Sequence, residues 1–302
     1  MSLRIGVPQG LLHFQYGSVL ERFLSELGAE VVLSGETSRN TLDCGGVLDE
    51  MCLPSKVFYG HTCSLRDKVD YLFLPRLVSI RQGQYTCPKI IGMPDVLRNS
   101  AGKWPPIIDV NVDMRQNSRQ LYQAVVTVGQ LLGRGVAASL YAWFRAWQCR
   151  ERLQTIEWVY DGRPRIALIG HPYILYDRQV SLGTLEKLAK LGMQTVTPEM
   201  VEPKQINCMA ARLEKKLFWS NSHTIAGAAM ALMTGKCPVQ GIIFLTCFAC
   251  GPDALVGELI RQQAGKRNIP CMQLALDEHT AEAGLVTRLE AFTDMVKRRL
   301  VR

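Results

Sequence analysis

The sequence predicts an α/β fold of two open, Rossmann- or flavodoxin-like lobes, each with a parallel sheet, and a cleft between the lobes. Three observations predict it. The chain has 302 residues, which suits two domains of about 150 residues each. Both halves open with a strand, a helix, a glycine and a second strand, which is the βαβ pattern of a parallel sheet. Short apolar runs then alternate with helical segments to the end of the chain.

The first half begins with a strand at 4–8, Arg-Ile-Gly-Val-Pro. A helix at 18–27 follows, because Leu and Phe recur there at helical spacing, and Gly28 caps it. The next strand is the Glu-Val-Val-Leu run at 30–33. The further elements expected in this half are strands at 71–74 and 107–110 and a long helical stretch at about 116–150.

The second half repeats this order with a strand at 165–170, a helix at 182–191, Gly192 as its cap, and a strand at 194–196. Its further expected elements are strands at 241–246 and 272–276 and helices at 210–233, 253–263 and 285–301. The turn signal Asp161-Gly162-Arg163-Pro164 separates the halves. We therefore expect two domains, 1–160 with the long helical connector, and 161–302.

Composition disfavours several classes of protein. No apolar run reaches the roughly 20 residues of a membrane span, and the N-terminus lacks a signal-peptide pattern, so we expect a cytoplasmic protein outside the membrane. There the 10 cysteines are expected to stay reduced. The net charge of +8 is dispersed, which disfavours nucleic acid and suits an acidic protein partner or a phosphate-bearing ligand. Neither G-x-x-x-x-G-K-[ST] nor G-x-G-x-x-G occurs, so the sequence gives no support for ATP binding by this chain.

Four cysteines lie where predicted strands end or helices begin. Cys247 and Cys250 separate the strand at 241–246 from the following helix, Cys87 lies in a loop, and Cys52 heads a helix. Ligands of open α/β sheets collect beyond the carboxyl ends of strands, and a helix N-terminus stabilises a thiolate. Proline or glycine close to these cysteines predicts turns whose amides point at sulfur, as in iron–sulfur sites.

The spacing of the thiols leaves three kinds of site open. Cys247-x-x-Cys250 is the only C-x-x-C in the chain, so a zinc ribbon would lack its second pair. The same pair could be a thioredoxin-like dithiol, although that motif normally follows an early strand of a small domain. Scattered cysteines that converge between two lobes favour an iron–sulfur cluster over both.

An ordered set of motifs runs along nearly the whole chain. Its members are Arg4-Ile5-Gly6-Val7-Pro8, Cys52-Leu53-Pro54-Ser55-Lys56, Gly60-His61, Phe73-Leu74-Pro75-Arg76, Cys87-Pro88-Lys89, Phe248-Ala249-Cys250-Gly251-Pro252-Asp253, Leu276-Asp277-Glu278-His279-Thr280-Ala281-Glu282-Ala283-Gly284 and Thr287-Arg288-Leu289-Glu290-Ala291-Phe292. By these motifs the chain resembles the activase-related proteins of the 2-hydroxyacyl-CoA dehydratase family. These proteins are akin to the dehydratase subunits and to double-cubane cluster proteins.

The resemblance implies an iron–sulfur protein that receives a low-potential electron from an ATP-hydrolysing iron–sulfur activator, which must be a separate chain. By position, Cys52, Cys87 and Cys250 resemble the three cysteine ligands of a dehydratase 4Fe-4S cluster, in which one iron stays open. Double-cubane proteins hold an 8Fe-9S cluster and need more cysteines. The further candidate ligands for that case are the nearby Cys44, Cys63 and Cys247.

Three polar residues are candidates for other roles. His61 could donate a proton near the cluster. His279, which lies beside two acidic residues after a predicted strand, could do the same. Arg76 follows a strand end and could hold an anionic ligand.

Three functional hypotheses follow. The first is an iron–sulfur redox component that performs reductive chemistry on a small substrate, with its status as an enzyme left open. The second is a non-catalytic accessory module, cluster-binding or metal-free, that docks on the activator. The third is a zinc-stabilised or metal-free binding module. A homodimer is expected because homodimers are the commonest assembly, and it would supply a second cluster.

Overall fold

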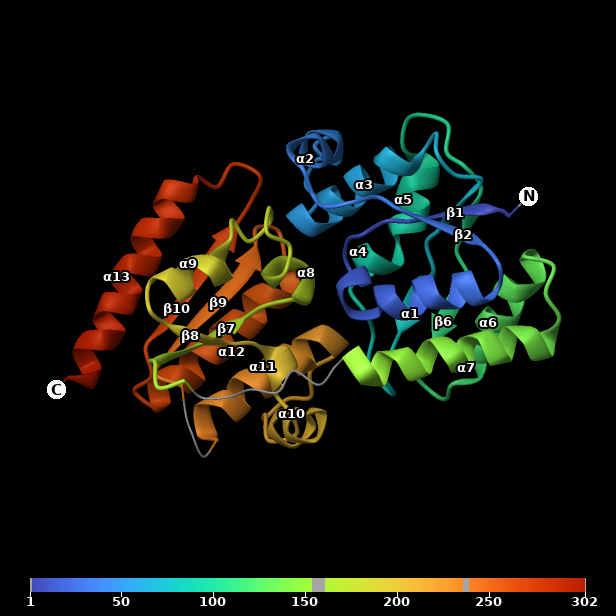
Figure 1. Ribbon diagram of the computed structural model, residues 1–302. Coiled ribbons are helices and arrows are strands. Elements are labelled where there is room, and N and C mark those ends of the chain that lie inside the picture. The colour runs from blue at the N-terminus through green and yellow to red at the C-terminus, as the bar shows by residue number, and fades with distance from the viewer. Residues whose placement is uncertain (1, 154–160, 236–238, 302) are drawn as a thin grey trace. The chain divides into compact units, whose positions relative to one another are not determined.

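The computed structural model describes residues 2–153, 161–235 and 239–301 (Figure 1). The chain divides into two compact units, Met1–Thr155 (unit 1) and Ile156–Arg302 (unit 2). The predicted domain boundary at 160/161 borders residues outside the described ranges, so its position stays a prediction. Each unit is a parallel sheet flanked by helices, which confirms the predicted α/β fold of Rossmann- or flavodoxin-like lobes.

The main sheet of unit 1 has the strand order β2-β1-β3-β5, and all its pairs are parallel. The strands are β1 (Arg4–Val7), β2 (Glu30–Leu33), β3 (Tyr71–Phe73) and β5 (Ile107–Ile108). A second, two-stranded sheet that the sequence did not predict pairs β4 (Arg76–Ser79) with β6 (Asn111–Asp113). Pro75 separates β3 from β4, and the amides on either side of it still donate across the sheet, Leu74 to the carbonyl of Ile108 and Arg76 to the carbonyl of Val110.

Helices cover both faces of the main sheet of unit 1. Ile5 and Val7 share one core with α1 (His13–Glu26), α6 (Arg119–Leu131) and α7 (Val136–Leu153). Gly6, between them, points to the other face, where it meets Leu65 at the end of α3 (Leu53–Leu65). The remaining helices of unit 1 are α2 (Arg39–Gly45), α4 (Pro88–Ile91) and α5 (Met93–Asn99).

Two helices of unit 1 differ from the prediction. The stretch at 116–150 is two helices, α6 and α7, because the chain turns at Gly133, whose φ of +70° is one that glycine adopts without strain. Helix α1 begins at residue 13, five residues before the predicted start at 18. No single helix of the described ranges is long and apolar enough to cross a membrane. Only α6 and α7 taken together reach that composition, and they are bent by 115°.

The sheet of unit 2 has the strand order β10-β9-β7-β8, again with parallel pairs throughout. Its strands are β7 (Arg165–Ile169), β8 (Gln194–Val196), β9 (Gly241–Cys247) and β10 (Cys271–Leu276). Every residue of β7 and of β9 is buried, as expected for central strands covered on both faces. From β7 the chain goes first to β8 on one side and later to β9 on the other. The crossover direction therefore switches between β7 and β9, the position at which open α/β sheets bind ligands.

The helices of unit 2 also form two layers. The buried faces of α11 (Ser220–Thr234) and α12 (Gly251–Lys266) share a core with β7 and β9. On the other face, Gly241 meets Phe292 and Val296 of α13 (Glu282–Leu300), which contacts α9 (Thr184–Lys190). Shorter elements are α8 (Pro172–Leu175), the 3-10 helix η1 (Pro198–Met200) and α10 (Pro203–Ala210).

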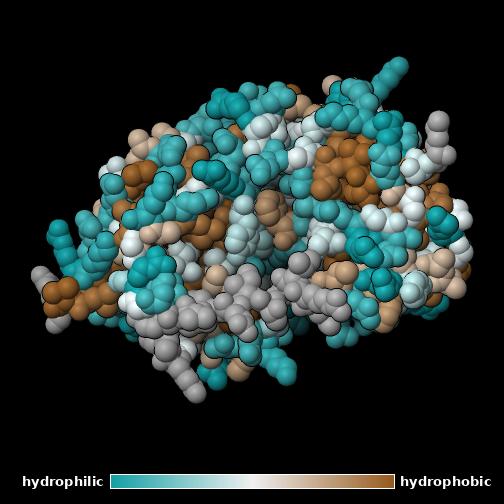
Figure 2. Space-filling view, viewed as in Figure 1, coloured by the Kyte–Doolittle hydropathy of each residue, from teal (hydrophilic) through white to brown (hydrophobic). Residues whose placement is uncertain are grey.

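One helix of unit 2 differs from the prediction of a single helix at 210–233. It is replaced by α10 and α11, since residues 211–219 form turns that pack Leu213 and Leu217 against the core. On the surface, polar side chains make up most of the face in Figure 2, and hydrophobic side chains interrupt them in separate patches. A predominantly polar face agrees with the dispersed charge of the sequence.

Candidate functional site

The three cysteines that the resemblance singles out share one local structure. Cys52, Cys87 and Cys250 are the N-cap residues of α3, α4 and α12, and each is in extended conformation with a proline at the first or second helical position. Proline suits these positions because its missing amide hydrogen would have no partner in the first turn. Helices α3 and α12 run from the carboxyl end of one parallel strand to the start of the next. Their N-termini therefore lie at the carboxyl edges of their sheets.

In unit 1, the backbone amides of Lys89 and Ile90 donate hydrogen bonds to the sulfur of Cys87. Burial raises the pKa of the Cys87 thiol, these two amides oppose the rise, and the nearby Cys52 thiol adds to it. The predicted turn with amides aimed at sulfur is thus confirmed for Cys87. Cys52 and Cys87, which are far apart in sequence, are brought together in this unit.

Two side-chain contacts hold the cysteine loops of unit 1. Lys89 Nζ donates to the carbonyl of Glu50 at 3.5 Å, which ties the start of α4 to the loop before Cys52. Cys52 Sγ lies 3.3 Å from Ser55 Oγ in the first turn of α3. Both cysteines are partly buried.

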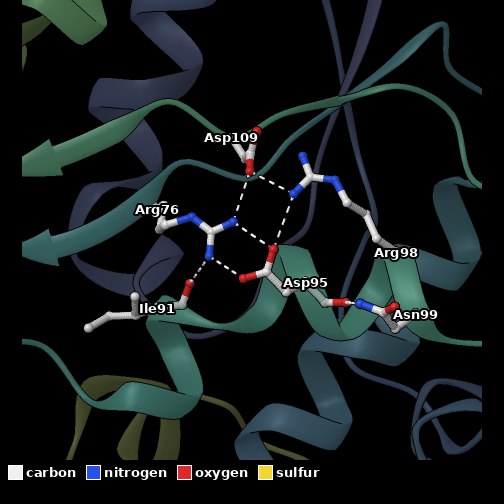
Figure 3. A network of polar contacts seen from close by, with 6 residues as sticks. All are labelled: Arg76, Ile91, Asp95, Arg98, Asn99 and Asp109. Atoms are coloured by element: carbon white, nitrogen blue, oxygen red, sulfur yellow. Dashed lines mark hydrogen bonds and ion pairs between the residues drawn. The ribbon is translucent and has the colours of Figure 1, made fainter.

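The side chain of Arg76 contacts the last residue of α4 (Figure 3). Its guanidinium donates to the carbonyl of Ile91 at 3.1 Å, to both carboxylate oxygens of Asp95, and to Asp109 at 3.0 Å. Arg98 bridges the same two carboxylates. The hydrogen bonds that Arg76 donates to Asp95 raise the pKa of the Arg76 guanidinium above its ordinary value. The hypothesis that Arg76 holds an anionic ligand is therefore wrong: its donors bind carboxylates and a carbonyl of the protein and clamp α4.

In unit 2, Cys250 lies beside a buried polar cluster. Asp253, in the first turn of α12, is fully buried, and its carboxylate accepts hydrogen bonds from Thr246 Oγ1 at 2.9 Å and from Cys250. His171 Nε2 lies 2.9 Å from Asp253 Oδ1. Burial on its own would raise the pKa of Asp253, but these three partners hold it below its ordinary value.

His171 is placed by the end of β7. It follows that strand directly after Gly170, it is the N-cap of α8, and its ring stacks on Tyr173 with centroids 4.8 Å apart. One ligand atom each of His171, Cys250 and Asp253 lie within 4.8 Å of one another. Sequence reasoning missed His171 and gave Asp253 no role. The signal available was a histidine immediately after a buried strand.

The remaining candidate cysteines are Cys44 and Cys63 of unit 1 and Cys247 of unit 2. Cys63, near the end of α3, hydrogen-bonds to Cys44 of α2, and burial together with Cys44 raises the pKa of Cys63 to about 12. An α-helix rises about 1.5 Å per residue, so Cys63 lies about 16 Å along α3 from Cys52. Cys247 is the buried last residue of β9, and its carbonyl accepts the amide of Cys250 at 3.2 Å. The assignment of these three cysteines as ligands stays a prediction.

The two candidate histidines differ in burial. His61, on α3, is buried with Nε2 2.9 Å from Thr37 Oγ1, and burial together with His13 lowers its pKa to about 4. A neutral imidazole at pH 7 can accept or relay a proton but carries no charge. His279 is exposed in a turn in which its amide donates to Asp277 Oδ1 at 3.0 Å. The catalytic assignments of His61 and His279 both stay predictions.

Comparison with known proteins gives two results. The uncharacterized protein MJ0800 of Methanocaldococcus jannaschii is 31% identical over 117 residues, which are 38% of this chain and 28% of that protein. This chain thus spans about 28% of the length of that relative. The family described as CoA enzyme activase uncharacterised domain matches residues 4–201, a range that includes Cys52, Cys87 and His171 and ends before Cys250. Because this match covers more than half of the sequence, the chain belongs to the family of the CoA enzyme activase uncharacterised domain.

Proposed function

We propose that this chain is an iron–sulfur redox component of the 2-hydroxyacyl-CoA dehydratase-related type. It receives low-potential electrons from a separate ATP-hydrolysing activator and uses them for reductive chemistry on a small substrate. One observation carries the proposal. Cys52 and Cys87 lie together at helix starts, and two backbone amides hydrogen-bond to the sulfur of Cys87. Such N–H···S contacts accompany cysteine ligands of iron–sulfur clusters and tune their potentials.

The residues have defined roles in this proposal. Cys52, Cys87 and Cys250 act as thiolate ligands, and the amides of Lys89 and Ile90 stabilise the sulfur of Cys87 without adding a net charge. When bound, the cluster would supply a one-electron redox centre with an iron open to a small ligand. Both the 4Fe-4S and the 8Fe-9S form belong to the proposal, and the iron content of the chain distinguishes them.

The proposed partner is an activator that hydrolyses ATP, an activity for which this sequence has no common motif. With neither common phosphate-binding loop in the chain, ATP hydrolysis is assigned to the activator. Membership of the family of the CoA enzyme activase uncharacterised domain supports a role as the partner of an enzyme. We further propose a cytoplasmic location and a homodimer, which would bring two clusters into one assembly.

The first test is to measure iron and acid-labile sulfide on anaerobically purified chain, with its absorption spectrum. About four iron per chain supports one cubane and about eight a double cubane. Cys52→Ala and Cys87→Ala should each lower the iron content, while the exposed Cys208 of α10 serves as a control in Cys208→Ala. No iron and no sulfide after anaerobic reconstitution would overturn the proposal.

A second measurement separates a redox component from an accessory module. The loaded chain is mixed with purified activator and ATP, and bleaching of the cluster absorption is followed. ATP-dependent bleaching supports electron uptake by this chain. Stable complex formation with the activator and no bleaching would instead assign the chain to the accessory role.

A further inference from the structure

The side chains around Cys250 in unit 2 include two residues, His171 and Asp253, to which the proposed iron–sulfur cluster assigns no role. The sulfur of Cys87 in unit 1 has amide donors, whereas Cys250 lies beside a fully buried carboxylate and an imidazole. His171 follows β7, and Cys250 with Asp253 follows β9. The three residues therefore meet at the position where the crossover direction of the sheet switches, which is the ligand-binding position of open α/β sheets.

Charge gives the first argument for a cation at this place. Any thiolate form of Cys250 lies next to the buried carboxylate of Asp253, and two like charges in a packed environment repel strongly. The neighbours of the carboxylate are Thr246, a neutral donor, and His171. Buried charges in proteins are paired or coordinate metals, and a divalent cation would neutralise thiolate and carboxylate together.

Geometry gives the second argument. In a tetrahedral zinc site with bonds of about 2.0–2.3 Å, ligand atoms lie about 3.4–3.6 Å apart. The ligand atoms of His171, Cys250 and Asp253 all lie within 4.8 Å of one another, and His171 Nε2 is 2.9 Å from Asp253 Oδ1. Shifts of the side chains by less than about 1 Å bring the three atoms to that spacing.

The buried imidazole supplies an independent observation. His171 Nδ1 is buried and has no hydrogen-bond partner within the part of the chain that the structure describes. In the metal-free chain Nε2–H donates to Asp253, and a metal at Nε2 requires that proton to move to Nδ1, where no hydrogen bond from the described residues opposes it. Stacking on Tyr173 holds the ring plane in place during such a change.

We propose that unit 2 binds one divalent transition-metal ion, preferably Zn²⁺, through His171, Cys250 and Asp253. A set of one nitrogen, one sulfur and one oxygen donor suits Zn²⁺ or Fe²⁺ and does not suit Mg²⁺ or Ca²⁺, which take oxygen ligands. Three protein ligands leave a fourth position for water, and the partly exposed Cys250 marks the side open to solvent. Because Cys250 is shared, the single ion and an iron–sulfur cluster exclude each other at this thiol.

The experiment uses the full chain with Cys52→Ser and Cys87→Ser, which removes two proposed cluster ligands. We expect about one Zn²⁺ per chain after dialysis, and Co²⁺ should give a thiolate-to-cobalt charge-transfer band. Adding Cys250→Ser should abolish that band, and Cys250→Ser or His171→Gln should each weaken Zn²⁺ binding by more than about tenfold. Asp253→Asn should weaken it similarly, and Cys208→Ser, on an exposed residue, should leave it unchanged.

Circular dichroism checks that each variant is folded. If a substitution at the buried His171 or Asp253 prevents folding, Cys250→Ser still tests the proposal. The proposal is overturned if the double variant binds no Zn²⁺, or if folded Cys250→Ser protein keeps the parental affinity and cobalt band. The result is separable from the proposed redox function. Iron and sulfide on the unsubstituted chain test that function, and Zn²⁺ binding by the double variant is independent of it.

Discussion

The cysteine sites of the two units share a helix N-cap position but differ in the groups that surround the sulfur. Cys87 in unit 1 and Cys250 in unit 2 both cap a helix that continues with proline. The sulfur of Cys87 accepts from two backbone amides and has the Cys52 thiol nearby, whereas Cys250 contacts a buried carboxylate that a histidine and a threonine hold. Amides stabilise sulfur without adding a charged ligand, but a carboxylate and an imidazole are themselves metal ligands. The same local motif is thus suited to different metal chemistry by its tertiary surroundings.

The buried histidines differ in the same way. His171 has the carboxylate of Asp253 at 2.9 Å, while His61 has the hydroxyl of Thr37 and a lowered pKa. Both have a buried Nδ1 without a hydrogen-bond partner among the described residues. Unit 1 therefore buries a neutral ring, and unit 2 buries a ring paired with an acid.

The largest expected effect is the loss of stability on substituting the buried Asp253 of unit 2. Asp253→Ala leaves His171 and Thr246 buried without their partner, and removing one member of such a pair costs about 3–5 kcal/mol. The free energy of unfolding from urea titration measures this. The control is Asp95→Ala, which removes an exposed carboxylate from the Arg76 clamp of unit 1 and should cost less. Equal losses in the two variants would contradict the contrast between the sites.

The second-largest expected effect is a loss of stability of unit 1 as the pH falls. His61 has an ordinary pKa of 6.5 and a folded-state pKa of about 4, so the unfolded chain takes up its proton first as the pH falls. The neutral His61 ring contributes fully to the free energy of unfolding above pH 6.5. This contribution is lost as the pH falls from 6.5 to about 4, and the loss is about 3 kcal/mol in total. Hydrogen exchange read by mass spectrometry should show unit 1 opening in this window. His61→Gln should remove that pH dependence, and an unchanged profile would rule out His61 as its source.

The smallest effect concerns the clamp on α4. Arg76→Ala removes its hydrogen bonds to Ile91, Asp95 and Asp109 and should cost about 1–3 kcal/mol. Because α4 carries Cys87 at its start, we also expect less iron per chain, with Zn²⁺ binding at Cys250 unchanged.

Arg98→Ala is the matched control for the clamp. Arg98 contacts the same two carboxylates, but the structure shows no bond from it to α4. Iron content that falls equally in both variants would show that the charge network, and not the link to α4, supports the cysteine site.

Local sequence patterns predicted much of the fold. Glycines after apolar helices and short β-branched runs gave β1, β2, β7 and β8 nearly to the residue. The same reasoning failed where a tertiary contact overrides a local pattern. Residues 211–219 continue a helical pattern but turn to pack two leucines on the core, and the β4–β6 pair is short and depends on long-range pairing.

The sequence by itself determined where thiols meet helix starts, because a cysteine close before proline dictates that geometry within a few residues. Only the tertiary structure decided what surrounds each thiol. It brought Cys52 near Cys87, engaged Arg76 with Asp95 and Asp109, and brought His171 to Asp253 across 82 positions of sequence. The physical reason is that strand order, which places loops beside one another, depends on long-range packing, and local spacing does not encode it.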